Sequence, residues 1–164
     1  MDVGFENAGY SIAFANEIDK ETAKTWKINR PQNADAMHTG DICAYMDELH
    51  ELKDIDVVFG GPPCQGFSIA GKMDPNDARS QMIWKFLEAV EIIQPKCFVL
   101  ENVEALSSIK RWQKTFQKII KYCENIGYTT TWRVHNVSDY GVCQNSINEI
   151  FSLSVYGLSR VANY

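Results

Sequence analysis

The chain has 164 residues, 45% of them hydrophobic, which suits one folded domain with its own core. The formal net charge of −5 argues against nucleic-acid binding on charge alone, because phosphate contacts use Lys and Arg. No apolar tract is long enough to span a bilayer and no N-terminal signal pattern is present, so we expect a cytoplasmic protein. The five cysteines are odd in number and form no Cys-x-x-Cys pair, which disfavours a disulfide framework and a metal site.

The first third of the chain predicts short alternating elements. These are a helix within residues 1–10 that Gly9 ends, a strand over 11–15 and a helix over 21–26. Glu17 follows the expected strand at its carboxyl end. An acidic side chain in that place can accept hydrogen bonds from the ribose hydroxyls of a nucleoside cofactor.

An apolar run that ends in a rigid loop organises the middle of the chain. Val57 to Phe59 read as a buried strand that stops at Gly-Gly-Pro-Pro, and Cys64 follows at once. Ligands of open α/β sheets bind outside the carboxyl ends of strands. The two prolines fix their φ angles and would hold Cys64 in one orientation, as a nucleophile requires. The ordinary alternative for a single cysteine is a small buried hydrophobe.

The second half continues the alternation of helices and strands. A polar, turn-rich stretch predicts a mobile loop over 69–77. We then expect a helix over 79–93, a strand over 97–100, and a helix over 109–123 that Ser107 or Ser108 caps. Two further strands are expected over 129–134 and 149–156. Glu101 then lies at the carboxyl end of its strand. Glu101 and Cys64 would leave the same edge of the sheet.

Basic residues gather on one side of the helix expected over 109–123. Lys110, Lys114, Lys118 and Lys121 share that side, and Arg111 is nearby. We interpret them as a solvated helix face, which is the usual role of such a run.

Two sequence blocks carry a family resemblance. Residues 60–68, Gly-Gly-Pro-Pro-Cys-Gln-Gly-Phe-Ser, resemble the catalytic loop of the DNA cytosine-C5 methyltransferases, and residues 98–103, Phe-Val-Leu-Glu-Asn-Val, resemble their Glu-Asn-Val block. The resemblance implies a Rossmann-like α/β sheet that uses S-adenosyl-L-methionine. It further implies that the Cys64 thiolate attacks C6 of a flipped cytosine in double-stranded DNA while Glu101 acts at N3.

The same resemblance implies two sets of contact residues. For S-adenosyl-L-methionine these are Glu17 at the ribose, Asp41 at the adenine amino group, Pro63, and Met82 packed against the cofactor. For DNA and the flipped base they are Gln65 and Ser68. The family chemistry needs no metal and no membrane.

The resemblance covers about residues 2–145, and residues 146–164 diverge. Where the family continues with Gln-x-Arg-x-Arg, this chain reads Gln144-Asn145-Ser146-Ile147-Asn148. The family's first strand with its glycine loop (Phe-x-Gly-x-Gly-Gly) and its target-recognition domain have no counterpart, so we expect a partial catalytic domain truncated at both ends. Without the first strand, a gap should separate the strand beginning near Ser11 from the one beginning near Asp56.

Three functional interpretations remain. The chain is the catalytic part of such a methyltransferase, made active by a complementing fragment that carries the missing parts. Alternatively it is an inactive, degenerate fragment of such an enzyme with at most an interaction role. A cysteine hydrolase would need a suitably placed histidine, and His38, His50 and His135 offer no motif for one.

Overall fold

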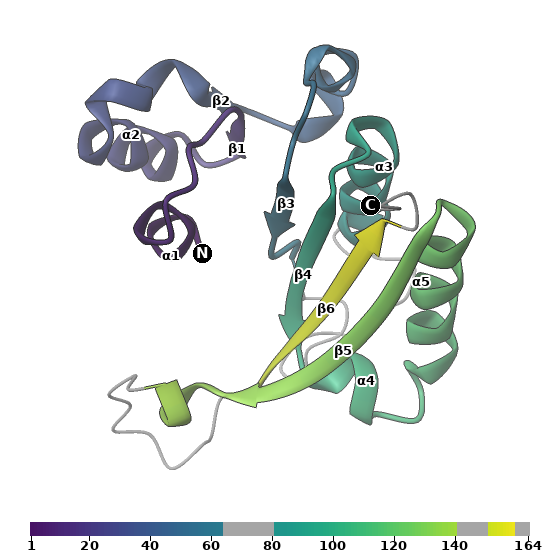
Figure 1. Cartoon of the computed structure of the whole chain (residues 1–164). Coiled ribbons are helices and arrows are strands. Elements are labelled where there is room, and N and C mark those ends of the chain that lie inside the picture. Colours follow the sequence, from purple (N-terminus) through teal and green to yellow (C-terminus); the bar gives the residue numbers. More distant parts are fainter. Residues whose placement is uncertain (64–80, 141–150, 160–164) are drawn as a thin grey trace. The chain divides into compact units, whose positions relative to one another are not determined.

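A computed structural model describes residues 1–63, 81–140 and 151–159. The chain divides into two compact units, residues 1–53 and residues 54–164 (Figure 1). Three predicted site residues, Cys64, Gln65 and Ser68, lie outside the described residues. The expected mobile loop and most of the stretch that departs from the family also lie outside them, so these predictions stay predictions.

The first unit is a two-stranded parallel sheet with helices around it. Its elements are α1 (Asp2–Asn7), β1 (Ala15–Glu17), α2 (Lys20–Asn29), β2 (Met37–Thr39) and three short 3-10 helices at Pro31–Ala36, Ile42–Ala44 and Glu48–Glu51. The prediction of a strand over 11–15 is wrong, because pairing with β2 begins only at Ala15. The side chain of Asn16 strengthens this later register by donating to the carbonyls of His38 and Gly40, each at 3.1 Å.

An ion pair joins α1 to the end of α2. The guanidinium of Arg30 donates from Nε to both carboxylate oxygens of Glu6, at 3.1 and 2.9 Å, and its Nη2 lies 2.8 Å from Oε2. It also lies over the ring of Trp26, 4.8 Å from the centroid. The hydrogen bond to Glu6 raises the pKa of Arg30 above its usual range. Because α1 buries no residue of its own, these polar contacts fix its position.

The second unit is a four-stranded mixed sheet in the order β3-β4-β6-β5. Its elements are β3 (Val57–Gly60), α3 (Met82–Ile93), β4 (Cys97–Val103), α4 (Ala105–Ser108), α5 (Gln113–Asn125), β5 (Tyr128–Asn136), a 3-10 helix at Val137–Tyr140 and β6 (Phe151–Ser159). β3 and β4 are parallel, and β6 is antiparallel to both of its neighbours. The strands of the first unit form a sheet of their own. The expected gap between the strands of the two units stays a prediction.

The expected helix over 109–123 begins later than predicted. Ser107 and Ser108 belong to α4, so neither caps α5, whose N-cap residue is Trp112 and has no side-chain capping bond. The indole of Trp112 is only 1% exposed. Burying this large ring in a turn between α4 and α5 displaces the helix start by four residues from Ile109. Gly127 ends α5 with a φ of 94°, as predicted.

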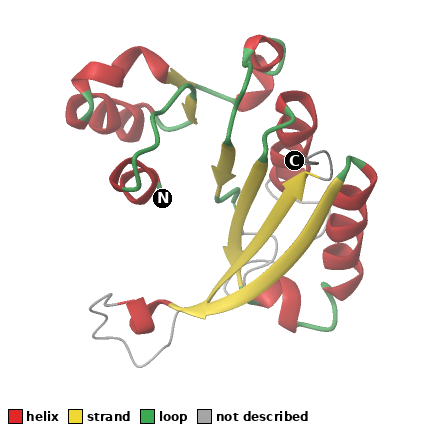
Figure 2. Ribbon diagram, viewed as in Figure 1, coloured by secondary structure: helices red, strands yellow, loops and turns green. Residues whose placement is uncertain are grey.

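One apolar core holds the second unit together. α3 and α5 lie on the same side of the sheet (Figure 2), where the ring of Trp84 meets that of Tyr122 edge-on at 6.0 Å. Phe98 and Leu100 of β4 face these helices and are almost fully buried. The alternation along β4 places Val99 and Glu101 on the opposite face.

Replacing Gly157 with Ala should destabilise the second unit. A Cβ at this position of β6 would overlap the ring of Phe98 on the neighbouring strand. We expect the free energy of unfolding, measured by urea denaturation, to fall by about 1–3 kcal/mol. Leu158→Ala, at a side chain that is 65% exposed, is the control and should cost less than about 0.5 kcal/mol. Equal losses in the two variants would contradict this packing.

Candidate active site

The parallel pairing of β3 and β4 brings the two motif blocks together. Gly60 lies opposite Leu100, so by count the next residues along β3, Gly61 and Pro62, come level with Glu101 and Asn102. The carboxyl ends of parallel strands meet at one edge of a sheet. Pro63 and Glu101 therefore lie at the same edge of the second unit, whereas the predicted position of Cys64 at this edge stays a prediction because Cys64 is outside the described residues.

The side chain of Asn102 ties the two blocks to each other. It is only 2% exposed, and its Nδ2 donates to the carbonyl of Pro62 at 3.1 Å. Its Oδ1 accepts from the backbone N–H of Val103 at 3.0 Å. A buried amide that uses both its donor and its acceptor is a geometric constraint, because breaking either bond leaves a polar group without water. It fixes the chain two residues before Cys64.

Glu101 lies inside a strand rather than after it. The prediction that β4 ends at Leu100 is wrong, since β4 continues to Val103 by pairing with β6, where Glu101 is opposite Ser154. The Glu101 side chain is half-buried and lies on the face of the sheet opposite the α3–α5 core. Pairing with β6 holds the backbone of Glu101 in place, which suits a residue that must meet a substrate atom in one geometry.

Two further predicted cofactor residues belong to the second unit. Pro63 is exposed, and Met82 is half-buried as the first residue of α3. α3 connects the carboxyl end of β3 to the start of β4, so its N-terminal end also lies at the edge that carries Glu101.

The remaining predicted cofactor residues, Glu17 and Asp41, lie together in the first unit. Glu17 is the last residue of β1, and Asp41 follows β2 by two residues, so both are at the carboxyl edge of this parallel pair. Glu17 Oε1 accepts from the N–H of Asp19 at 2.9 Å, and Asp41 Oδ1 accepts from the N–H of Cys43 at 2.9 Å. These bonds orient the two carboxylates. Each carboxylate can accept about four hydrogen bonds, so both still fit hydroxyl and amino donors of a nucleoside.

The described cysteines differ from a nucleophile in their surroundings. Cys123 is fully buried, and burial raises the pKa of its thiol to about 12. Burial likewise raises the pKa of Cys97. Both thiols remain protonated near neutral pH, and the thiolate is the reactive form. The third described cysteine, Cys43, is exposed on the first unit.

Two of the grooves on the described part of the chain include no predicted site residue. One lies along α1 and α2, and the other lies between α5 and β5. Within the same residues no helix is long and apolar enough to cross a membrane. A search of the described ranges for three or more His, Cys, Asp or Glu side chains placed to hold a metal ion finds none.

A family model described as C-5 cytosine-specific DNA methylase matches residues 1–146. The chain belongs to this family. Curated relatives include the type II methyltransferases M.NgoPII of Neisseria gonorrhoeae, 37% identical over 145 residues, and M.FnuDI of Fusobacterium nucleatum, 38% identical over 146 residues. Each alignment covers 88% of this chain and 41% of the relative. The chain therefore spans less than half the length of these family members.

Solved structures agree on the fold. A putative DNA modification methyltransferase encoded within an Escherichia coli prophage has a TM-score of 0.68 at 24% identity, over 93% of this chain and 41% of that one. A DNMT2 mutant from Spodoptera frugiperda has a TM-score of 0.68 at 17% identity, over 98% of this chain and 46% of that one. At these identities the likeness supports the Rossmann-like methyltransferase fold and nothing finer.

Sequence reasoning missed Asn102 as a site residue. The signal that could have found it is its place beside Glu101 in an otherwise apolar strand, where a polar side chain facing the core needs partners. The partner, Pro62, is 40 positions away and only strand pairing brings it near.

Asn102→Asp should destabilise the second unit. The variant keeps the size and the acceptor for the N–H of Val103 but replaces the donor to Pro62 with a buried carboxylate oxygen facing a carbonyl. We expect the free energy of unfolding to fall by at least about 2 kcal/mol in urea titrations at neutral pH. Asn125→Asp, at an exposed residue of α5, should cost less than about 1 kcal/mol. If the Asn102 variant is as stable as the Asn125 variant, the hydrogen bonds of the buried Asn102 amide do not hold the two blocks together as inferred.

Proposed function

We propose that this chain is the catalytic part of a DNA (cytosine-5-)-methyltransferase of a bacterial restriction–modification system, acting in the cytoplasm. The observation that supports this most directly is the Asn102 bond, which joins the backbone before Cys64 to the strand that carries Glu101. Family membership supports the reaction class. The substrate would be a cytosine flipped out of double-stranded DNA, because C5 and C6 are enclosed in the stack.

Cys64 and Glu101 would share the activation of the base. C6 of cytosine is a weak electrophile, and the Cys64 thiolate is the nucleophile best suited to neutral pH. Glu101 would hydrogen-bond or protonate N3 and so take up the charge that develops on the ring. Gln65 and Ser68 would contact the DNA and the base. After C5 is methylated, loss of the C5 proton and elimination of Cys64 restore the aromatic ring.

The carboxylates of the first unit would bind the cofactor. S-adenosyl-L-methionine supplies the methyl group when it is bound. Glu17 would accept from its ribose hydroxyls and Asp41 from its adenine amino group, while Pro63 and Met82 would pack against it. The orientation of Glu17 and Asp41 by backbone N–H groups supports these roles.

A complementing polypeptide is the second part of the proposal. β1 and β3 are edge strands of the two described sheets, and the chain matches only 41% of M.NgoPII. Edge strands accept further strands. A fragment that carries the rest of such a relative would extend both sheets and would include the target-recognition part. An inactive, degenerate fragment of the enzyme is the alternative, and the experiments below separate the two.

Binding of S-adenosyl-L-methionine tests the cofactor residues. By isothermal titration calorimetry, Asp41→Ala should weaken binding about tenfold or more, because one lost hydrogen bond to a charged acceptor is worth at least about 1.4 kcal/mol. Asp41→Asn is the matched control, since its side-chain oxygen can still accept from Cys43 and from an amino group. An equal loss of affinity for S-adenosyl-L-methionine in the two variants would show that only the charge of Asp41 matters. If the unchanged folded chain does not bind S-adenosyl-L-methionine, the degenerate-fragment alternative is favoured.

A covalent adduct tests the catalytic residues. With duplex DNA carrying 5-fluorocytosine and with S-adenosyl-L-methionine, the chain should form a complex that survives denaturing electrophoresis, because fluorine cannot leave as the C5 proton does. Cys64→Ser should abolish this complex and Glu101→Gln should slow its formation at least about tenfold. Adding the part of M.NgoPII that lies outside the alignment should raise the yield. No adduct with or without that fragment would refute the catalytic proposal.

A further inference from the structure

The helix α5 and the turn before it carry an unusual concentration of positive charge. Residues 105–123 contain no Asp or Glu, and their five basic residues are Lys110, Arg111, Lys114, Lys118 and Lys121. We call these five residues the basic face, and all of them are exposed. Residues 54–164 contain 11 Lys and Arg and 11 Asp and Glu, so this unit has no net charge. Five of its 11 basic residues belong to the basic face, so the positive charge is concentrated there.

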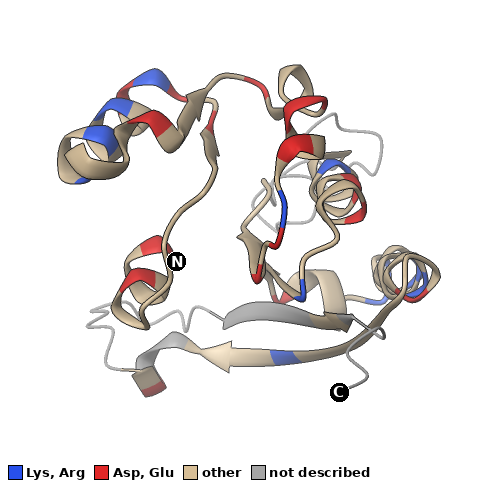
Figure 3. Cartoon of the chain, turned by 45° about the horizontal axis from the view of Figure 1, so that its top comes forward, with Lys and Arg blue, Asp and Glu red and all other residues tan. Residues whose placement is uncertain are grey.

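The geometry of α5 turns these charges into one surface. Lys114, Lys118 and Lys121 follow the i, i+4, i+7 spacing of a helix side, opposite the buried Phe116 and Cys123. Figure 3 colours the lysines of α5 blue on the ribbon. Ion pairs of the described residues occupy Lys85 and Lys96 elsewhere in this unit, but none involves the basic face. Lys114 to Lys121 span about 10 Å of helix axis, the rise of about three base pairs.

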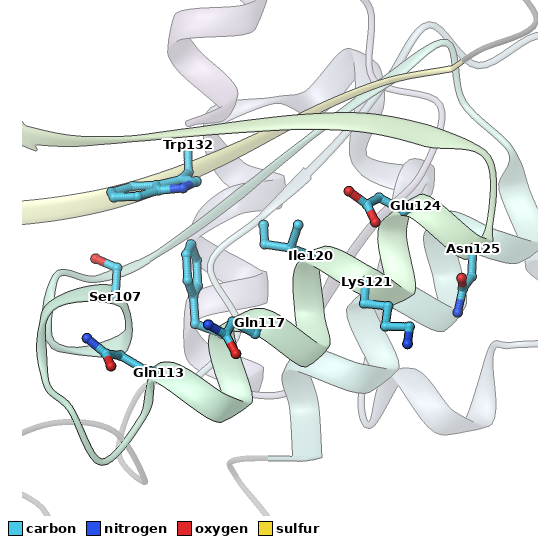
Figure 4. Close-up of a pocket in the computed structure, with 9 residues that line it drawn as sticks. Ser107, Gln113, Gln117, Ile120, Lys121, Glu124, Asn125 and Trp132 are labelled. Carbon is cyan, nitrogen blue, oxygen red and sulfur yellow. The ribbon is translucent and has the colours of Figure 1, made fainter.

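A groove of about 570 Å³ adjoins the basic face between α5 and β5 (Figure 4). Its wall includes the indole of Trp132, which is 50% exposed and meets Phe116 edge-on at 5.4 Å. Gln113, Gln117 and Lys121 line the same groove, and so does the carboxylate of Glu124. Amide N–H groups donate to phosphate and sugar oxygens as ammonium groups do. The part of the groove at Gln113 and Gln117 therefore offers donors that suit a nucleic-acid backbone.

The fold connects this surface to the edge that carries Glu101. β4 ends at Val103, α4 follows directly, and the turn with Lys110 and Arg111 leads into α5. α5 then returns to the start of β5, which runs parallel to β4. The basic face thus begins beside the catalytic edge and runs away from it along α5. Lys110 and Arg111, in the turn between α4 and α5, are therefore the basic-face residues nearest to that edge along the chain.

A second helix shows what an ordinary solvated face looks like in this chain. On α2, Lys20, Lys24 and Lys27 have the same i, i+4, i+7 spacing, but Asp19 and Glu21 accompany them. Mixed signs are usual on solvent-facing helices because neighbouring opposite charges stabilise them. On α5, Glu124 lies three residues after Lys121, but Lys114 and Lys118 have no acidic residue within four positions along the helix, and like charges four residues apart destabilise a helix.

We propose that the basic face binds the backbone phosphates of duplex DNA that flank the target cytosine. This replaces the solvated-face interpretation of the sequence and rests on the proposed function for its choice of DNA as the polyanion. Phosphate contacts of this kind position the duplex without reading its sequence. They would give an acidic chain the affinity for DNA that its net charge of −5 opposes.

The salt dependence of DNA binding tests the proposal. Fluorescence anisotropy with a labelled duplex of about 30 bp, between about 50 and 200 mM salt, gives the slope of log K against log salt. The triple variant Lys114→Gln, Lys118→Gln and Lys121→Gln should lower the magnitude of this slope by about 2–3, because each phosphate contact contributes about 0.9. The matched triple variant Lys20→Gln, Lys24→Gln and Lys27→Gln changes the net charge equally and should lower it by less than about 1.

The other outcomes overturn the proposal in distinguishable ways. Equal changes in both triple variants would show a dependence on net charge alone. If the slope is unchanged in the α5 variant and S-adenosyl-L-methionine binding is intact, the basic face does not bind DNA. The proposed function would not be affected by that result. In sedimentation, the unchanged chain could be a dimer that the α5 triple variant dissociates. That result would assign the basic face to a contact with residues 1–53 of a second copy, which hold 10 Asp and Glu against 5 Lys and Arg. No DNA binding by the unchanged chain, with or without the part of M.NgoPII that lies outside the alignment, would refute both proposals.

Discussion

The parallel pairing of β3 with β4 is the constraint on which the candidate active site depends. Two parallel strands end at the same edge, and their register decides which residues of the two following segments can touch. Here the register sets Pro62 level with Asn102, and one hydrogen bond then fixes that relation. A shift of the register by one residue would turn Asn102 away from the core and break the bond. The proposed chemistry of Cys64 and Glu101 would thus rely on the backbone pairing of β3 with β4.

Both sides of β4 contribute to that constraint. β3 supplies the loop with the cysteine, while β6 extends β4 by three residues beyond Leu100, through Glu101, Asn102 and Val103. A polar pair at the end of a free strand would be solvated. Pairing with β6 instead makes them part of the sheet, with Asn102 directed to the core and Glu101 to the other face. One strand extension therefore places a structural residue, Asn102, beside Glu101, for which we propose a catalytic role.

Local sequence patterns predicted those parts of the fold whose causes are local. The apolar run that Gly and Pro terminate located β3 to within one residue, and the helical spacing of apolar residues located α3. The pattern failed where a distant partner decides. β1 begins at Ala15 because of β2, β4 extends to Val103 because of β6, and α5 starts late because Trp112 is buried. Asn102 was missed for the same reason, since its partner becomes a neighbour only after strand pairing.

The division of the chain distributes the proposed site over two sheet edges. Glu17 and Asp41 end the β1–β2 pair, whereas Pro63 and Glu101 end the β3–β4 pair. In the proposed function the first edge would bind the cofactor and the second would activate the base, so each edge would supply one half of the reaction. β1 and β3 are edge strands of their sheets. An edge strand presents unpaired N–H and C=O groups, so each sheet can accept a further strand there.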